Sequence, residues 1–350
     1  MFLRRNPNQD HSAELYTVKY APKRLLDFKG NQGVVQTLSS YIESNNIPNL
    51  IITGPHGTAK SLLVRLLIDE YMSVSGGGDR SEYLGQGLLE IYGSLSRGKD
   101  VVSEKQSVKN KQKNFNCANI TDFMKKATKL PRGILKIVVI YEFHQMSTEA
   151  QMALRRIMEL NAHKVRFIFV TQDYSQIIHA LQSRCTILKL RGLDKDEMQE
   201  ILEGICKAEG IDPSPELMEL IYLNADGDIR VAINLLQVLG KCNVGEMGKG
   251  VYYQILGMPE IDTIKKILKA CSEGRGREAH ITVRELMDSG YDISDLLDIL
   301  TRVLIQMPEF SRRDGFIRVL CQSTFTIQEC YTETQLHNLV NRLVNVGLEN

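Results

Sequence analysis

Four short apolar runs mark the first 190 residues of the chain, at 50–53 (LIIT), 134–140 (ILKIVVI), 165–170 (VRFIFV) and 185–190 (CTILKL). Segments with the helical spacing of apolar residues lie between them, at 62–72 and 148–160. Runs that are apolar at nearly every position are typical of strands buried on both faces in a parallel sheet. The alternation of strands with helices therefore predicts a doubly wound α/β domain at residues 1–190.

Strand patterns end near residue 190, and the later segments have the apolar spacing of amphipathic helices. We expect helices at 194–210, 215–223, 228–239, 261–271, 277–289, 293–307, 315–321 and 333–346. The glycines of 242–250 (CNVGEMGKG) predict a linker between two groups of these helices. The division gives a small helical domain at 191–245 and a larger one at 250–350. Exposed loops are expected at 73–80 and in a polar insert at 103–116.

The composition predicts a soluble protein that is not exported. Apolar residues make up 43% of the chain and charged residues 24%, which suffices for a normal core. No apolar run approaches the roughly 18 residues that span a bilayer, and the polar N-terminus lacks the apolar stretch of a signal peptide. The seven cysteines are scattered without a C-x-x-C pair, so we expect reduced thiols rather than a zinc site or a disulfide framework.

Positive charge is concentrated in one part of the chain, although the net charge is only +1. Residues 97–136 hold eleven Lys or Arg residues against three acids. Such a field attracts the phosphate backbone of nucleic acid without sequence preference. A solvated loop that binds no partner is the alternative interpretation.

The segment 54–61 (GPHGTAKS) matches the phosphate-binding loop G-x-x-x-x-G-K-[ST] except at one position, and it lies between a predicted strand and a predicted helix. In such loops backbone N–H groups surround the phosphates, the Lys reaches the outer phosphates, and the hydroxyl holds Mg²⁺. The candidate nucleotide ligands are Gly54, Pro55, His56, Gly57, Thr58, Ala59, Lys60 and Ser61, the last also a candidate Mg²⁺ ligand. Ala59 replaces a glycine, and its methyl group crowds a close approach to phosphate.

The run at 134–140 is followed by Tyr141 and Glu142, where nucleotide hydrolases carry an acidic pair. The second acid of the pair activates the attacking water, so Glu142 is a candidate catalytic residue, with a solvated strand-end charge as the alternative. The first acid holds Mg²⁺ through its water shell. Tyr141, a phenol with an ordinary pKa of about 10, does not supply that charge. His144 has no second ligand at helical spacing, so we expect no metal site there.

Several motifs together resemble the small subunits of replication factor C, the clamp loader of eukaryotes and archaea, over nearly the whole chain. The segment 16–22 (YTVKYAP) is similar to the family's W-V-E-K-Y-R-P, 89–102 (LEIYGSLSRGKDVV) to L-E-L-N-A-S-D-x-R-G-I-D-V-V, and 146–159 (MSTEAQMALRRIME) to M-T-x-x-A-Q-x-A-L-R-R-x-M-E. The S-R-C signature stands at 183–185, and 227–237 (GDIRVAINLLQ) resembles G-D-M-R-R-A-I-N-L-L-Q. The segment from Gly250 onward resembles the start of the collar domain that holds five subunits in a ring.

The resemblance implies an AAA+ P-loop domain at 1–190, a helical lid at 191–245 and an all-helical collar at 250–350 that serves oligomerisation. It implies ATP or ADP with Mg²⁺ as cofactors, and the loading of a ring-shaped sliding clamp onto primer–template DNA. The expected partners are the other subunits of a five-membered ring, the clamp and the DNA. The expected location is the nucleus in a eukaryote and the cytoplasm otherwise.

The same motifs imply roles for individual residues. Further nucleotide contacts are expected from Tyr20, Pro22, Gly30, Asn31, Gln172 at the sensor 1 position and Arg230 at the sensor 2 position. Arg184 is expected to act in trans as an arginine finger, because a planar and always charged fork suits the phosphate oxygens of a neighbouring site. DNA contacts are expected from Arg97, Lys99, Ser147 and Thr148, while Arg155 and Arg156 resemble a pair that links nucleotide sites to DNA.

Most of the departures from the family pattern affect residues that hydrolysis needs. They are Ala59 in the loop, Tyr141 at the magnesium position, Gln172 in place of Asn and Ala21 in place of Arg. Together with the retained Arg184 they favour a subunit that binds nucleotide but hydrolyses ATP poorly or not at all. Two alternatives stay open. One is a working ATPase in which a carboxylate such as Asp173 replaces the missing Asp, and the other is a scaffold subunit without nucleotide.

Overall fold

The computed structural model describes residues 14–75, 87–94, 120–125, 135–211, 214–241, 253, 255–307, 309–310, 312–329 and 332–348. The chain divides into two compact units, 1–235 and 236–350. The expected insert at 103–116, the expected linker at 242–250 and the candidate DNA ligands Arg97 and Lys99 lie outside the described residues. The first unit continues to residue 235 without a division near residue 190. The expected division into domains at 1–190, 191–245 and 250–350 stays a prediction.

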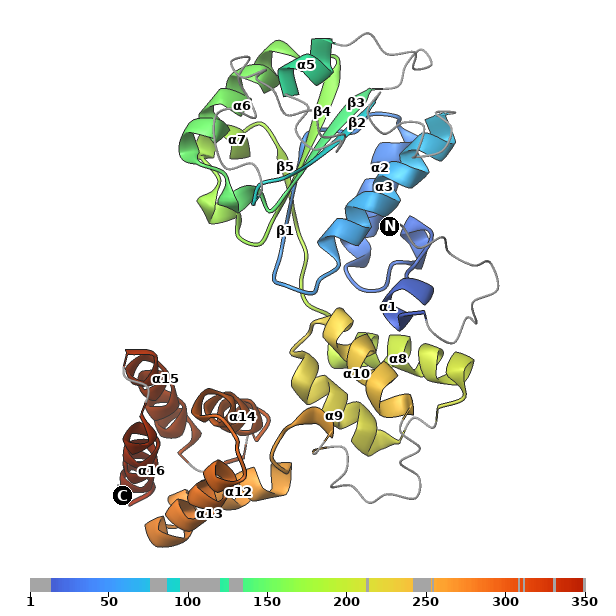
Figure 1. Ribbon diagram of the computed structural model, residues 1–350. Helices are drawn as coiled ribbons and strands as arrows, with labels where there is room; N and C mark the ends of the chain where they lie inside the picture. The colour runs from blue at the N-terminus through green and yellow to red at the C-terminus, as the bar shows by residue number, and fades with distance from the viewer. Residues whose placement is uncertain are drawn as a thin grey trace, which may run out of the picture. The chain divides into compact units, whose positions relative to one another are not determined.

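In its described residues the first unit is built on a sheet of five parallel strands in the order β2-β3-β4-β1-β5 (Figure 1). The strands are β1 (Leu50–Thr53), β2 (Leu88–Tyr92), β3 (Lys136–Tyr141), β4 (Val165–Thr171) and β5 (Thr186–Lys189). Ile51 of β1 pairs with Phe169 of β4 and with Ile187 of β5. Because all strands run in one direction, the loops after β1, β3 and β4 leave from the same edge of the sheet, where α/β folds bind ligands.

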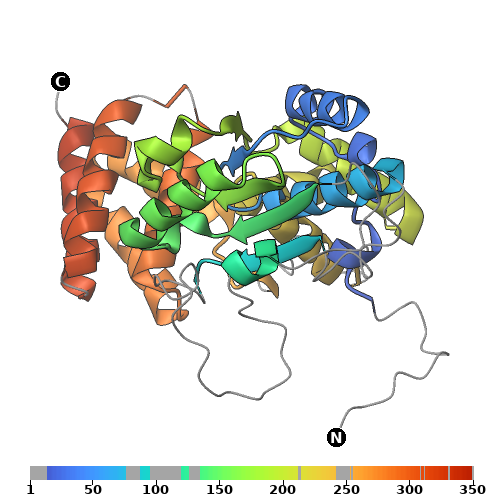
Figure 2. The same cartoon turned by 90° about the horizontal axis from the view of Figure 1, so that it is seen from above.

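Helices cover both faces of the sheet (Figures 1 and 2). α2 (Gln32–Glu43) and α3 (Lys60–Ser75) lie on one face, and α5 (Ile120–Lys125), α6 (Thr148–Leu160) and α7 (His179–Gln182) lie on the other. Side chains alternate between the layers, so Ile52 packs in the core with α3 whereas Ile51 packs with α6. The arrangement confirms the predicted doubly wound fold. Four short elements join its parts: α1 (Tyr16–Lys19), η2 (Leu25–Asp27), η4 (Phe143–Gln145) and η5 (Tyr174–Gln176).

In the described residues, the first helices after the sheet are α8 (Lys195–Glu209), α9 (Pro215–Ala225) and α10 (Ile229–Lys241). Their limits are set by local capping. At the start of α8 the carboxylate of Glu197 accepts from the backbone N–H of Asp194 at 3.1 Å, and Gly210 ends the helix with a left-handed φ of 69°. The hydroxyl of Ser214 accepts from the N–H of Leu217 at 3.3 Å and caps α9. They correspond to the helices predicted at 194–210, 215–223 and 228–239.

The second unit packs helices around a core of its own. In its described residues these are α12 (Ile261–Ser272), α13 (Gly276–Asp288), α14 (Ile293–Ile305), α15 (Arg313–Glu329) and α16 (Glu333–Leu348). Leu268, Phe316 and Leu343 are fully buried in this core. α13 and α16 also meet through His280 and His337, whose Nδ1 atoms lie 3.0 Å apart. The helical character of this region is as predicted, and none of the described helices has both the length and the apolar character to cross a bilayer.

Some elements differ from the expectations. The pattern does not predict β2, because Glu90 interrupts its apolar run, and it does not predict α2, in which few positions are buried. The expected loop at 73–80 is wrong for 73–75, which remain in α3 because the first glycine comes at residue 76. α15 extends well beyond the expected 315–321, because its second half buries little apolar surface and leaves a weak pattern.

We expect Cys271 to resist alkylation in the folded chain while Cys321 reacts. Cys271 is fully buried in α12, and burial raises the pKa of its thiol to about 12, whereas Cys321 is exposed. The thiolate is the reactive form, and at pH 8 its fraction at Cys271 is on the order of 10⁻⁴. Limited iodoacetamide labelling with peptide mass spectrometry checks this, and faster labelling of Cys271 than of Cys321 would contradict it.

Candidate functional site

A cavity of about 970 Å³ lies in the first unit, at the edge of the sheet where the strands end. A hollow of this size suits a small-molecule ligand. The predicted site residues among those that line it are Tyr20, Pro22, Asn31, His56, Gly57, Thr58, Ala59, Lys60, Ser61, Glu142, Gln172 and Arg230. Gly30, Gly54 and Pro55 adjoin these residues in the chain without lining the cavity. Segments that are far apart in the sequence therefore meet at one place.

Lys60 is the half-buried ammonium of the phosphate loop. Its Nζ donates to the carbonyl oxygens of Gly54 at 2.7 Å and Pro55 at 2.6 Å. Burial lowers the pKa of Lys60, and the positive charge of Arg230 lowers it further, while Asp228 acts in the opposite direction. Two positive charges therefore lie at the same end of the cavity as the N-terminus of α3, and this arrangement suits an anion such as phosphate.

The helix α10 begins against the phosphate loop. Asp228 caps α10, since its carboxylate accepts from the N–H of Arg230 at 2.8 Å, and it also pairs with the Arg230 guanidinium at 3.3 Å. A Cβ at Gly57, whose φ is 73°, would lie 2.0 Å from Cγ of Asp228. Only glycine fits at that point, so the loop and the start of α10 are matched in shape, and Arg230 is brought to the cavity.

Ala59 holds the loop in a conformation that disfavours a side chain. Its φ is 55°, in the left-handed region, which costs an L-residue about 1–2 kcal/mol. This is the position at which the phosphate-loop pattern has glycine. At this position the loop therefore keeps a backbone shape that suits glycine, although the residue is alanine.

We expect Ala59→Gly to raise the free energy of unfolding by about 0.5–1 kcal/mol, because relief of the left-handed strain exceeds the added flexibility of the unfolded chain. Urea unfolding followed by circular dichroism measures this change. The matched control is Ala153→Gly within α6, which is expected to destabilise by about 1 kcal/mol, since glycine disfavours a helix interior. A loss of stability in Ala59→Gly comparable to that of the control would contradict the strain.

Tyr141 ends β3 where the magnesium-holding acid is expected. Its hydroxyl donates to Oε1 of Glu90 on the neighbouring β2 at 2.9 Å, and its ring stacks on Tyr92 with ring centroids 5.1 Å apart. Tyr92 stands where the family segment similar to 89–102 has Asn, so this departure and the departure at Tyr141 lie against each other. Glu90, bonded to this phenol, is not among the cavity-lining residues. The strand end therefore presents a stacked aromatic pair in place of a carboxylate.

Glu142 follows in a strained backbone conformation with a φ of 51°, and it lines the cavity. The backbone is closely packed here, because a Cβ on Gly93 would lie 2.5 Å from the carbonyl oxygen of Glu142. Strained residues of this kind are frequent at functional sites. The acid expected to activate water, Glu142, is therefore present in the cavity lining, whereas Tyr141 stands in place of the acid expected to hold Mg²⁺.

The end of β4 contributes Gln172 to the cavity, and its carbonyl oxygen accepts from the hydroxyl of Thr53 at 3.1 Å. Asp173, the candidate substitute for the missing acid, does not line the cavity. Its carboxylate accepts from the hydroxyl and, at 2.8 Å, from the N–H of Ser175, and these hydrogen bonds lower the pKa of Asp173. His144 lines the cavity, but within the described ranges no three His, Cys, Asp or Glu side chains form a metal-binding group.

The N-terminal segment 15–22 and the residues 193–233 supply apolar side chains to the lining of the cavity. Apolar lining residues from the two are Val18, Ala21, Pro22, Leu193, Ile201, Ile229 and Ile233. Apolar walls of this kind suit the flat ring of a nucleobase. A Cβ at Gly30, whose φ is 75°, would lie 2.4 Å from Cδ2 of Leu193. Glycine at this position therefore allows the backbone at residue 30 to approach the side chain of Leu193.

Arg184 lies outside the cavity, in the turn between α7 and β5. Its Nη2 pairs with Glu159 of α6 at 2.6 Å, and its Nη1 donates to the carbonyl of Ala180 at 2.8 Å. Glu159 also accepts from Arg155 at 3.2 Å, and Arg155 first and Arg184 next lower the pKa of Glu159. The Arg184 side chain keeps 35% of its surface exposed and is accessible to another molecule.

The exposed start of α6 has the predicted position. Ser147 is the N-cap, with its hydroxyl accepting from the N–H of Ala150 at 3.3 Å, and Thr148 is the first helical residue. Lys136 of the basic stretch behaves differently, because its ammonium is buried and donates to the carbonyl of Phe123 at 2.9 Å. That charge is directed into the fold and not toward a partner.

Motif reasoning misses four residues that shape the cavity, namely Asp228, Tyr92, Arg191 and Glu209. Asp228 could have been found from the segment 227–230 (GDIR), because the Asp is shared with the family pattern G-D-M-R. Tyr92 could have been found because it differs from the Asn of the family segment that also contains Glu90. Arg191 and Glu209 carry no signal in the sequence, because their partners lie far away in the chain.

Comparison with known proteins gives matches along most of the chain. A family model described as "DNA polymerase III, delta subunit" matches residues 30–194, and one described as "Replication factor C C-terminal domain" matches residues 259–341. The "Replication factor C small subunit" of Picrophilus torridus is 33% identical over 81% of this chain and 81% of its own. That of Aeropyrum pernix is 31% identical over 84% of this chain and 85% of its own. "Replication factor C subunit 4" of Oryza sativa subsp. japonica is 33% identical over 82% and 78%.

Among solved structures, the RuvB Holliday junction branch migration motor of Thermotoga maritima aligns with a TM-score of 0.50. The alignment covers 85% of this chain and 92% of that one at 18% sequence identity. Similarity at this level of identity concerns the fold alone, and it agrees with a P-loop sheet domain followed by helices.

Proposed function

The chain belongs to the replication factor C small subunits, and on that premise we propose that it is a clamp-loader subunit with an impaired ATPase site. In this proposal the cavity binds ATP or ADP, the chain's own hydrolysis of ATP is poor or absent, and Arg184 acts on nucleotide bound by a neighbouring subunit. The loader would use ATP to place a sliding clamp on primer–template DNA.

Nucleotide binding is supported by the match between the cavity and a nucleotide. Lys60 and Arg230 supply positive charge at one end of the cavity, beside the N-terminus of α3. The apolar lining residues, such as Val18 and Pro22, suit the base. The lining thus offers the chemistry that the phosphates and the base of a nucleotide each require.

The observation that carries the proposal of poor hydrolysis is the placement of Tyr141. Its hydroxyl is bonded to Glu90 and its ring is stacked on Tyr92. Ser61 remains as a hydroxyl ligand for Mg²⁺, but the carboxylate that normally assists it is missing, so the ion would be held weakly. Glu142 is retained, yet it would lack a well-placed ion to work with.

The role in trans is supported by the position of Arg184. The residue lies outside its own chain's cavity, and its guanidinium is oriented by Glu159 and Ala180 while remaining partly exposed. A fork held in this way can enter the site of a second subunit with little loss of side-chain freedom. The partners in this proposal are the other subunits of a five-membered ring, the clamp and primer–template DNA, reached by Ser147 and Thr148 and by the basic stretch.

The proposal is tested by isothermal calorimetry of the full chain with ADP and with the slowly hydrolysed analogue ATPγS, each with and without Mg²⁺. We expect both nucleotides to bind, with an affinity that changes less than about threefold when Mg²⁺ is removed, since a weakly held ion contributes little. Binding that requires Mg²⁺ and disappears in Asp173→Ala would favour a working ATPase. The absence of heat and of thermal stabilisation with either nucleotide would leave a scaffold subunit.

A further inference from the structure

One wall of the cavity is formed by two segments that are far apart in the sequence. The N-terminal segment 15–22 contributes Val18, Tyr20 and Pro22, and α8 contributes Ile201. Neither segment is part of the central sheet. The shape of this wall of the cavity therefore depends on the contacts that join the segment 15–22 to α8.

Glu209, in the last turn of α8, provides the main junction. Its carboxylate accepts from Nζ of Lys19 at 2.6 Å and from the hydroxyl of Tyr20, which lie 190 and 189 residues away in the chain. Tyr16 also hydrogen-bonds Glu209. The bonds from Lys19 first, and from Tyr20 next, lower the pKa of Glu209, so the carboxylate is ionised at neutral pH.

These contacts immobilise the ring of Tyr20 where it lines the cavity. The ring packs edge-on against Tyr16 with centroids 5.8 Å apart, and Nζ of Lys19 lies 5.2 Å from the Tyr20 centroid. The hydroxyl of Tyr20 is bonded to Glu209. Only the ring is then available to a ligand, and its orientation is fixed from behind by a charge-assisted hydrogen bond.

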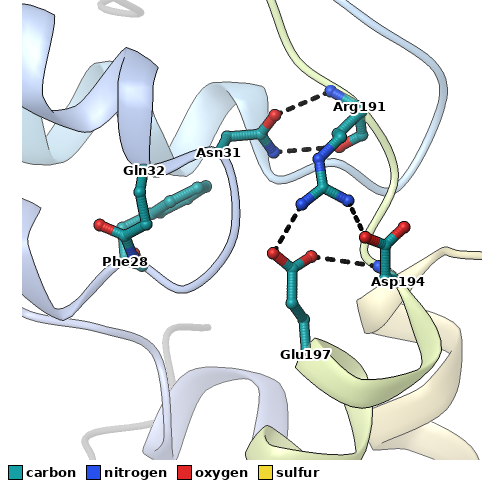
Figure 3. A network of polar contacts seen from close by, with 6 residues as sticks. All are labelled: Phe28, Asn31, Gln32, Arg191, Asp194 and Glu197. Carbon is teal, nitrogen blue, oxygen red and sulfur yellow. Dashed lines mark hydrogen bonds and ion pairs between the residues drawn. The ribbon is translucent and has the colours of Figure 1, made fainter.

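A second junction, made by Asn31, holds the start of α8. The side-chain amide of Asn31 accepts from the backbone N–H of Arg191 at 2.9 Å and donates to its carbonyl at 3.0 Å (Figure 3). The guanidinium of Arg191 in turn pairs with Asp194 and, at 2.7 Å, with Glu197 at the start of α8. α8 is therefore attached near both of its ends, and Glu209 makes the attachment beside the apolar lining.

We propose that Glu209 is a positioning residue for nucleotide binding, which acts by clasping Lys19 and Tyr20 so that the segment 15–22 and α8 form one wall for the base. The inference rests on the proposed nucleotide site and adds a residue outside the cavity that sets its affinity. Because coupling is reciprocal, a nucleotide that binds better to the clasped form also stabilises the clasp.

The test is calorimetric titration of the full chain with ADP. Glu209→Gln is expected to weaken ADP binding about tenfold, because it removes the charge from the shared acceptor. Tyr20→Phe keeps the ring, loses the hydroxyl and is expected to weaken binding about threefold. The double variant is expected to bind within about twofold of Glu209→Gln alone, since both changes break the same junction. Glu203→Gln is the matched control on α8, because the Glu203 carboxylate accepts from the side-chain amide of Gln199 at 2.8 Å and neither residue lines the cavity, and it is expected to change binding less than about twofold.

A second measurement separates positioning from a merely structural role. With ADP added to the native chain, amide hydrogen exchange in 15–22 is expected to slow at least about fivefold, while exchange in α14 of the second unit stays unchanged. This readout remains informative if Glu209→Gln does not fold.

ADP affinity of Glu209→Gln within about twofold of the native value, or unchanged exchange in 15–22 on ADP binding, overturns the inference and leaves the nucleotide site intact. Failure of the native chain to bind ADP would instead overturn the nucleotide site and this inference with it.

Discussion

Replacement of Arg184 by Ala is expected to lower ATP hydrolysis by the assembled loader by about three orders of magnitude at the neighbouring site, because an arginine finger contributes about 10³–10⁵ in rate. Nucleotide binding by this chain itself is expected to stay unchanged, since Arg184 does not line the cavity. The measurement is single-turnover hydrolysis in a loader whose other ATPase sites are blocked, leaving only the site that Arg184 is proposed to complete.

The control for that experiment is Arg275→Ala. Arg275 is also exposed and paired with carboxylates, Glu273 and Glu278, but it belongs to the second unit and does not line the cavity. Arg184→Lys is expected to rescue only a small part of the rate, because an ammonium does not reproduce the planar fork. Full activity of Arg184→Ala at equal amounts of assembled loader would contradict the role in trans.

Removal of the ammonium in Lys60→Met is expected to weaken ATP binding by about 100-fold, or about 2.7 kcal/mol, because the loop loses its strongest attraction for phosphate. Fluorescence titration of a labelled ATP analogue measures the change. Lys195→Met is the matched control, since Lys195 lies over the ring of Tyr222 and does not line the cavity. Equal affinity of the Lys60 variant and the native chain would contradict a phosphate site at 54–61.

The protonation of Lys60 predicts the sign of a pH dependence. Burial and the charge of Arg230 lower the pKa of Lys60 below its ordinary value. The charged form binds phosphate, so ATP affinity is expected to be highest at pH values below that pKa and to fall as the pH rises through it. The fall is expected at a lower pH than the ordinary lysine pKa of about 10.4.

Local pattern predicts the parts of the fold that depend on neighbours in the chain. The run 50–53 and the loop after it specify β1 and the start of α3, because glycine and proline end the strand and the helix begins directly after the loop, at Lys60. The start of α6 is predicted as well, since Ser147 is a good N-cap. β2 is missed, because Glu90 looks like a break when its partner on β3 is unknown.

The contacts that decide the chemistry of the site are long-range and carry little local signal. Tyr141 in the sequence is only a missing acid, whereas in the fold it is bonded to Glu90, 51 residues away, and stacked on Tyr92. Glu209 is an ordinary helix-end acid until the segment with Lys19 is folded against it. Such pairs are fixed by tertiary packing, so a single sequence does not reveal them.

The most direct measurement of the impaired site is the fate of radiolabelled ATP bound to the isolated chain with Mg²⁺, primer–template DNA and clamp present. We predict that the protein retains intact ATP, with no release of phosphate above the level of the Glu142→Gln variant. Steady production of ADP that Glu142→Gln abolishes would contradict the claim, because it would show that Tyr141 and Ala59 leave hydrolysis at this site intact.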